Sequence, residues 1–106
     1  MVDIRTFGDW TLLTDEEIPT TLRETDTKDL AVALKGKGED IRKVEKRIMP
    51  NISKRVQGLI RNFWAESFIF PEDIEASQKK ILRTIHSLQN IGKIRPSSEN
   101  QTQQQQ

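Results

Sequence analysis

Residues 51–66 read NISKRVQGLIRNFWAE, the most regular pattern in the chain. The apolar residues recur with the period of an α-helix and form one stripe, which consists of Ile52, Val56, Leu59, Ile60, Phe63 and Trp64. Lys54, Arg55, Arg61 and Asn62 lie on the other side. We therefore predict an amphipathic helix, capped by Asn51 or Ser53, that closes a core with one face and presents a basic surface with the other.

The composition restricts the class of protein. The chain has 106 residues, of which 31% are charged and 34% hydrophobic, and its formal net charge is +1. This length suits one small domain, and the near neutrality gives no overall attraction to nucleic acid or membranes. Since the chain has no cysteine, no membrane-spanning stretch and no secretory signal at its start, we expect a cytoplasmic protein.

Few residues in the sequence suit catalysis. The single histidine, His86, falls in a helical pattern without a serine or an acid arranged as a relay. Gly36 and Gly38 lack the rest of a phosphate-binding loop. We interpret the chain as a protein that is not an enzyme and that needs neither a cofactor nor a metal.

Local signals predict the first part of the fold. The segment 1–13 has no clear period, but its large apolar side chains are expected to dock on the core, as a leading segment or as a short helix. Thr14 and Glu17 form a capping-box pattern for a helix over residues 15–24. Pro19 is expected to remove one hydrogen bond and to bend or shorten this helix.

The next two helices are separated by glycines. Asp26 or Thr27 is predicted to cap a short helix that is apolar on nearly all sides and should therefore be buried. Gly36 is predicted to end it in the left-handed conformation. A third helix is predicted over residues 39–48, and Pro50 should end it.

An apolar connector and a long final helix follow residue 66. Phe68 and Phe70 in the connector are predicted to plug the core, although one of them is alternatively an exposed anchor. The final helix should begin at Pro71 or at the next residue, because proline is favoured in the first helical position. Gly92 should end it.

The predicted fold is all-α, a compact five- to six-helix bundle or short right-handed helical solenoid over residues 1–95. Residues 96–106 have no apolar content apart from the proline and should form a disordered, glutamine-rich tail.

Three blocks of this sequence resemble one known family. They are LRETDTKDLAVALKG (Leu22–Gly36), NISKR (Asn51–Arg55) and DIEASQKKILRTIHSLQNIGKI (Asp73–Ile94). In this order and at nearly this spacing, they are similar to the C-terminal domain of the flagellar motor switch protein FliG. The resemblance covers roughly residues 7–95.

The resemblance implies a location, partners and a contact surface. FliG lies at the cytoplasmic face of the inner membrane in the flagellar basal body, and a charged ridge on its C-terminal domain meets the cytoplasmic loop of the stator protein MotA. FliM and further FliG copies are its rotor neighbours. Lys35 and Arg55 match the family at two ridge positions, and the neighbouring candidates are Arg61, Asn62 and Phe63. These five are called the ridge residues below.

Several family features are missing. The family carries an acidic pair seven and eight residues after the ridge arginine, where this chain has Asn62 and Phe63. The family's Gly-Pro-Val-Arg turn is replaced by the shorter connector with Phe68 and Phe70, and its Met-Phe-x-Phe hinge by residues 4–7. The resemblance therefore suggests a divergent form whose stator contact is altered, weakened or absent.

The sequence leaves two questions open. Phe63 is either a core residue, as its period indicates, or an exposed aromatic anchor for a partner. The function is either that of a motor component or that of a scaffold module that uses the same fold for packing against another protein. A third alternative is nucleic-acid binding through seven cations within twenty residues, which are Arg42, Lys43, Lys46, Arg47, Lys54, Arg55 and Arg61.

Overall fold

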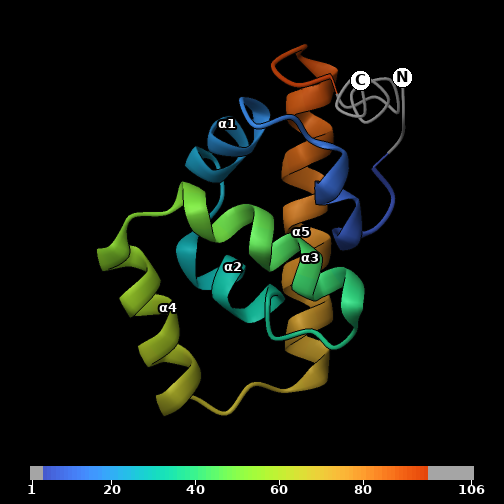
Figure 1. The fold of residues 1–106 in the computed structure, drawn as a ribbon. Coiled ribbons are helices and arrows are strands. Elements are labelled where there is room, and N and C mark those ends of the chain that lie inside the picture. The colour runs from blue at the N-terminus through green and yellow to red at the C-terminus, as the bar shows by residue number, and fades with distance from the viewer. Residues whose placement is uncertain (1–3, 96–106) are drawn as a thin grey trace.

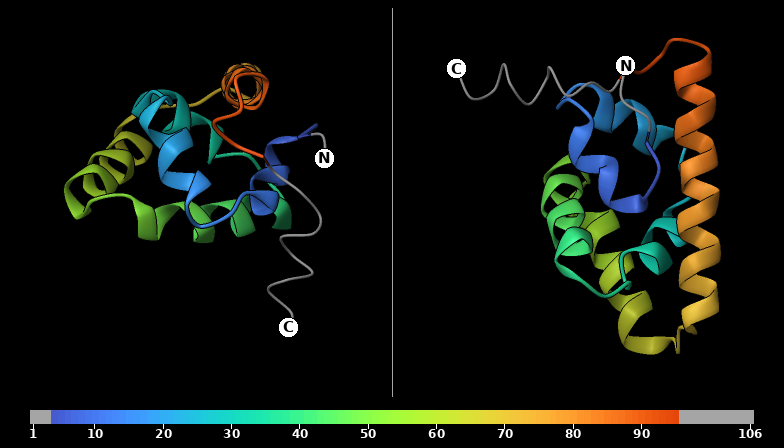
Figure 2. Two further views of the ribbon diagram at one scale, coloured as in Figure 1. Left: turned by 90° about the horizontal axis from the view of Figure 1, so that it is seen from above. Right: turned by 90° about the vertical axis from the view of Figure 1, so that its right-hand side faces the viewer.

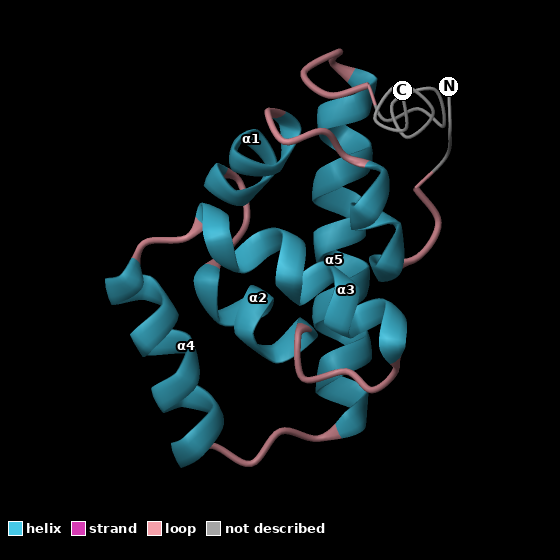
Figure 3. Ribbon diagram, viewed as in Figure 1, coloured by secondary structure: helices cyan, strands magenta, loops and turns pink. Residues whose placement is uncertain are grey.

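The computed structural model describes residues 4–95, which form helices and loops without a strand (Figure 3). The elements in chain order are η1 (Phe7–Leu12), α1 (Glu17–Arg23), α2 (Thr27–Ala33), α3 (Glu39–Ile48), η2 (Met49–Asn51), α4 (Lys54–Glu66) and α5 (Pro71–Asn90), where η denotes a 3-10 helix. The predicted all-α fold is confirmed. The predicted tail 96–106 lies outside the described residues.

Helix α2 lies in the middle of the fold, with α4 on one side and α5 on the other (Figure 1). Every residue from Leu30 to Leu34 is buried, as predicted for a short helix that is apolar on nearly all sides. Helix α5 stands beside the other helices along most of their height (Figure 2), and it contributes Ile81, Ile85 and Leu88 to the core.

Helix α4 is amphipathic as predicted, but its apolar stripe is only partly covered. Ile60 is its single buried residue, and Leu59 is 51% exposed. The reason is one of length. Helix α2 has 7 residues against 13 in α4, so at 1.5 Å per residue it spans about half the length of the stripe.

The N-terminal segment docks on the core, as expected. Ile4, Phe7, Trp10 and Leu13 are buried, and Leu12 is half-buried against the same core. The His86 ring lies on the surface of α5, and its Nε2 atom is 2.5 Å from the carbonyl oxygen of Ile4. His86 therefore ties the start of the described chain to the last helix.

Capping signals in the sequence precede three of the helices. Thr14 and Glu17 form the predicted reciprocal capping box, in which the Thr14 amide donates to Oε1 of Glu17 at 2.9 Å and the Glu17 amide to Oγ1 of Thr14 at 3.2 Å. Helix α1 begins at Glu17 and not at residue 15, so Pro19 lies in its first turn. The regular helix is therefore shorter than the predicted range 15–24. Asp26 caps α2 and Ser53 caps α4.

The glycines after α2 and α5 act differently from each other. Gly92 ends α5 as predicted, with a φ of 79°. Two amides after the helix donate to carbonyls of its last turn, Lys93 N to Leu88 O and Gly92 N to Gln89 O. Gly36 is not left-handed, which corrects the prediction, because only Gly38 and Gly92 have a positive φ among the described residues. Gly36 lies against α5 instead, where a Cβ atom would be 2.6 Å from Nε2 of Gln78.

The connector between α4 and α5 does not fill the core, which corrects the prediction that Phe68 and Phe70 plug it. Phe68 is 79% exposed and Phe70 is 50% exposed. Their rings meet edge to face with centroids 4.7 Å apart. The connector crosses from one end of α4 to the start of α5 at the periphery of the fold (Figure 1), so its side chains have no second layer of structure to cover them.

Candidate protein-interaction site

The C-terminal end of α2 is closed by side chains from three other helices. Backbone carbonyls at the end of a helix have no partner within it and need other donors. The Trp64 indole donates to Ala31 O at 2.7 Å, and Gln78 Nε2 donates to Ala33 O at 3.1 Å. Arg42 Nη2 donates to Leu34 O at 2.5 Å and to Gly36 O at 2.9 Å. This end of α2 is therefore fixed from α4, α5 and α3.

Lys35 follows directly on this fixed end and is exposed. Its Nζ atom lies 5.4 Å from the centroid of the Trp64 ring, within the range of a cation–π interaction. The exposed charge is thus attached to a rigid base and held against α4. The sequence does not indicate this role for Trp64, since its period only assigns the ring to the apolar stripe. An indole N–H that is covered by the core needs an acceptor, however. This need is the one sequence signal that points to a hydrogen bond from Trp64.

The other polar ridge residues lie along the outer surface of α4. Arg55 and Asn62 are seven residues apart and share one face, and both are exposed. Arg61 is exposed on the adjoining face, one turn before Trp64. Arg55 precedes Trp64 by about 14 Å along the helix axis. Lys35 and Arg55 therefore mark the two ends of an extended surface and do not form one compact site.

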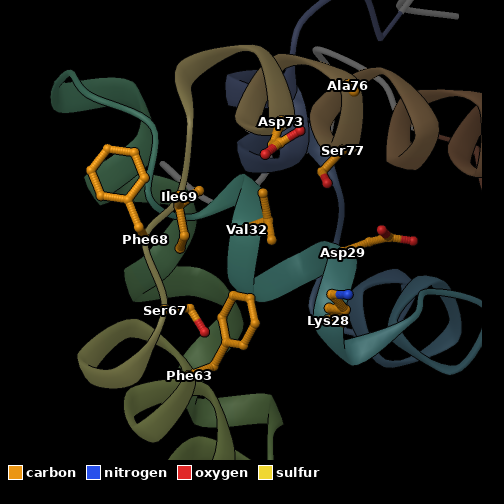
Figure 4. Close-up of a pocket in the computed structure, with 10 residues that line it drawn as sticks. All are labelled: Lys28, Asp29, Val32, Phe63, Ser67, Phe68, Ile69, Asp73, Ala76 and Ser77. Atoms are coloured by element: carbon orange, nitrogen blue, oxygen red, sulfur yellow. The ribbon is translucent and has the colours of Figure 1, made fainter.

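Phe63 is half-buried. Its exposure thus lies between the two predicted alternatives, a core residue and an exposed anchor. It packs against the core and lines two cavities between α2 and α4. The larger one, of about 440 Å³, opens between α2, α4, the connector and α5 (Figure 4). Phe63 and Val32 face each other across it, and Asp73 lies on the α5 side (Figure 4).

The seven cations between residues 42 and 61 do not form a uniform basic patch. Arg42 is bonded to Glu45 at 2.6 Å as well as to the end of α2. Arg47 pairs with Asp15 at 3.1 Å and also donates to the carbonyl of Leu13. Two of the seven therefore serve the fold itself, which weakens the nucleic-acid interpretation.

An ion pair links the two helices that enclose this region. Lys80 Nζ on α5 lies 2.7 Å from Oδ2 of Asp29 on α2. The hydrogen bond to Asp29, together with the attraction of its charge, raises the pKa of Lys80 above its ordinary value. Within residues 4–95 no cluster of three or more His, Asp or Glu side chains suits a metal ion, and each helix is too short or too polar to span a bilayer.

Together, the fold and the ridge define an all-helical domain that carries exposed charges on a rigid support. The family model of the FliG C-terminal domain matches residues 3–95, and the chain belongs to this family. Two curated relatives are named flagellar motor switch protein FliG. The one from Thermotoga maritima is 36% identical over 91 residues, and the one from Borreliella burgdorferi is 38% identical over 91 residues.

These alignments cover 83% of this chain but only 26% and 25% of the relatives, so the chain spans about a quarter of their length. Solved structures agree in fold. FliG residues 116–343 from H. pylori match with a TM-score of 0.74 and 28% identity, over 86% of this chain and 39% of that one. Full-length FliG from Aquifex aeolicus matches with a TM-score of 0.71 and 29% identity. This match covers 83% of this chain and 27% of that one.

Proposed function

We propose that this chain acts in the rotor of the bacterial flagellar motor and meets the cytoplasmic loop of the stator protein MotA through Lys35 and Arg55. Arg61, Asn62 and Phe63 complete the contact surface. In this role the domain sits at the cytoplasmic face of the inner membrane, beside FliM and other FliG copies. Membership of the FliG C-terminal family supports the proposal.

The observation that carries the proposal is the attachment of Lys35. Its charge is exposed, yet it follows a helix end that three other helices hold in place, and it rests on the Trp64 ring. Exposed charge pairs contribute about 0–1 kcal/mol each, and charge mainly steers the encounter of two proteins. Contacts of this strength suit a surface that must engage and release a stator repeatedly.

Asn62 and Phe63 stand where the family carries acids, so we expect the contact to rest on the positive ridge residues. The test measures binding of the MotA cytoplasmic loop by fluorescence anisotropy, with wild type, Lys35→Glu and Arg55→Glu. Each reversal should weaken binding by about fivefold or more, equivalent to about 1 kcal/mol. Added salt should weaken the wild-type contact and leave the reversed variants less affected.

Lys46→Glu is the matched control, because Lys46 is also exposed on a helix and has no ion-pair partner within residues 4–95. It should bind the loop nearly as wild type does. If wild type and both ridge variants bind equally well, the ridge assignment is wrong.

A second candidate function is that of a scaffold module, which the exposed Phe68 and Phe70 favour. Under this alternative, binding to a rotor neighbour depends on apolar contacts and survives both charge reversals. The salt dependence of binding separates the two functions, since burial of apolar surface is not weakened by added salt.

A further inference from the structure

We propose that the connector between α4 and α5 is a docking surface for a peptide segment that combines a large apolar side chain with lysine or arginine. It goes beyond the proposed motor function because its test requires no stator, although its cavity shares Phe63 with the ridge residues. Its parts are the exposed aromatic pair, the cavity behind the connector and the carboxylates around it.

The aromatic pair supplies the apolar contact area. Phe68 and Phe70 are 79% and 50% exposed and pack edge to face on each other. Exposed aromatic rings in a preformed arrangement are typical of the residues that dominate binding energy. Since the two rings already support each other, little side-chain freedom remains to be lost when a partner covers them.

The cavity behind the connector supplies a place for an anchoring side chain. It measures about 440 Å³, and Val32, Phe63 and Ile69 form its apolar lining. Figure 4 shows Phe68 at its outer edge, on the opposite side from Lys28 and Asp29. A leucine, phenylalanine or tryptophan side chain of a partner fits a space of this size and can contact its apolar side, while the polar side faces Asp29 and Asp73.

The charges around the connector select a basic partner. Glu66 precedes the aromatic pair, Glu72 and Asp73 follow it, and all three are exposed without an ion pair among the described residues. Of the other charged residues nearby, Asp29 is neutralised by Lys80 and Lys28 is unpaired within residues 4–95, while Lys35 and Lys37 line the adjoining cavity beside Pro71. Carboxylates nevertheless flank the aromatic pair on both sides along the chain, and charge complementarity favours lysine or arginine beside the two rings.

Other occupants fit these observations less well. The segment 96–106 of this chain offers no large apolar side chain to fill the cavity. An anionic membrane surface would be repelled by the carboxylates that flank the rings. The observations therefore favour a basic, apolar segment of another protein.

The test selects binders from a phage-displayed library of random peptides of about 16 residues, long enough for a four-turn helix. The bait is the full chain, and a Phe68→Ser, Phe70→Ser double variant removes peptides that bind elsewhere. The enriched sequences should combine large apolar residues with a net positive charge. Equal enrichment on both baits, or a net negative charge in the enriched set, overturns the proposal.

Titration of one enriched peptide then locates the site. The Phe68→Ser, Phe70→Ser variant should lose at least about tenfold in affinity, as expected for a pair of anchoring aromatics. Ile91→Ser is the matched control, since Ile91 is 67% exposed but lies beyond the far end of α5. It should leave the affinity unchanged. Glu66→Gln with Glu72→Gln should weaken binding by several-fold and flatten its salt dependence.

Two alternative occupants are checked with the same variants. Sedimentation equilibrium reports self-association, and flotation with phosphatidylcholine and phosphatidylserine vesicles reports membrane binding. A dimer or a vesicle complex that disappears in the Phe68→Ser, Phe70→Ser variant assigns the connector to that occupant and overturns the proposal. A monomer that does not float with vesicles, together with a basic enriched set, supports it.

Discussion

The ammonium group of Lys35 lies 5.4 Å from the centroid of the Trp64 ring, and the N–H of the same indole donates to Ala31 O at 2.7 Å. One side chain of α4 therefore performs two tasks at the end of α2. Its edge satisfies a backbone carbonyl, and its face holds the first charge that follows the helix. The position of that charge consequently depends on a residue far along the chain.

A double-mutant cycle can measure this coupling. We expect Lys35→Met and Trp64→Leu to interact by about 0.5–1 kcal/mol in urea unfolding, the range of an exposed cation–π contact. The methionine keeps an apolar stem of similar length and removes the charge. Lys37→Met is the control, because Lys37 is exposed without a bonded partner in the described chain, and it should show no coupling to Trp64. Equal coupling energies for both lysines would contradict the assignment.

Two glycines should respond to alanine with opposite sign. Gly58 lies inside α4 with nothing within 4 Å of a built Cβ atom, so Gly58→Ala should stabilise the fold by about 0.5–1 kcal/mol. Gly36→Ala brings Cβ to 2.6 Å from Gln78 Nε2. It should displace the bond from Gln78 to Ala33 and destabilise by about 1 kcal/mol.

Urea midpoints of the two variants give the comparison. In a Gln78→Ala background the obstructing amide is absent, so Gly36→Ala should no longer destabilise. A loss of stability that persists in this background would show that the backbone at Gly36, and not the contact with α5, requires glycine.

The arginines of the basic segment should differ from its lysines in their effect on folding. Arg42→Met leaves the carbonyls of Leu34 and Gly36 without their donor, and we expect a loss of about 1–3 kcal/mol. Lys43→Met, on the neighbouring and exposed residue, should change stability by less than about 0.5 kcal/mol. Chemical unfolding of both variants tests this, and similar effects would contradict the hydrogen-bond argument.

The ion pair between Lys80 and Asp29 should make stability depend on pH in the alkaline range. The pKa of Lys80 in the folded state lies above the ordinary value of 10.5, because the hydrogen bond to Asp29 and the negative charge of Asp29 stabilise the protonated amine. A raised pKa of this kind contributes stability in full below the unfolded value, and the contribution is lost as the pH rises through the folded value. The stability difference between wild type and Asp29→Asn should therefore shrink from about pH 9 to about pH 12.

An NMR titration of the Lys80 side chain gives the second measurement. Asp29→Asn should lower the pKa of Lys80 toward 10.5. Glu24→Gln removes an exposed carboxylate that forms no ion pair in the described chain, and it should leave that pKa unchanged. An unchanged pKa of Lys80 in Asp29→Asn would contradict the pairing.

The parts of the fold that the sequence predicts correctly are the helix ends, which are set by interactions between residues close together in the chain. Asp26, Ser53 and Pro71 mark helix starts through bonds or φ preferences within a few residues. Gly92 ends a helix for the same kind of reason. Such signals depend on neighbouring backbone groups alone, so they predict helix ends from the sequence without knowledge of the tertiary structure.

The missed features depend on residues that are distant in sequence. The closure of α2 joins Ala31 to Trp64 and Ala33 to Gln78, and no local pattern encodes these pairs. The period of α4 indicates which residues could be covered, but the short α2 determines how many of them are. Hydrophobicity alone places Phe68 and Phe70 in the core, but they are exposed because no other element covers the connector at the periphery of the fold.

Helix α5 joins the surface near Lys35 to the ends of the described chain. Its first turn lies beside Lys35, where both line one cavity, and near its other end His86 holds Ile4. Beyond α5, the Arg95 amide donates to Oε2 of Glu17 at 2.5 Å. A helix of 20 residues, about 30 Å long, therefore separates the surface near Lys35 from residues 4 and 95. Under the proposed function, the length of one helix would therefore separate the contact at Lys35 from both ends of the described chain.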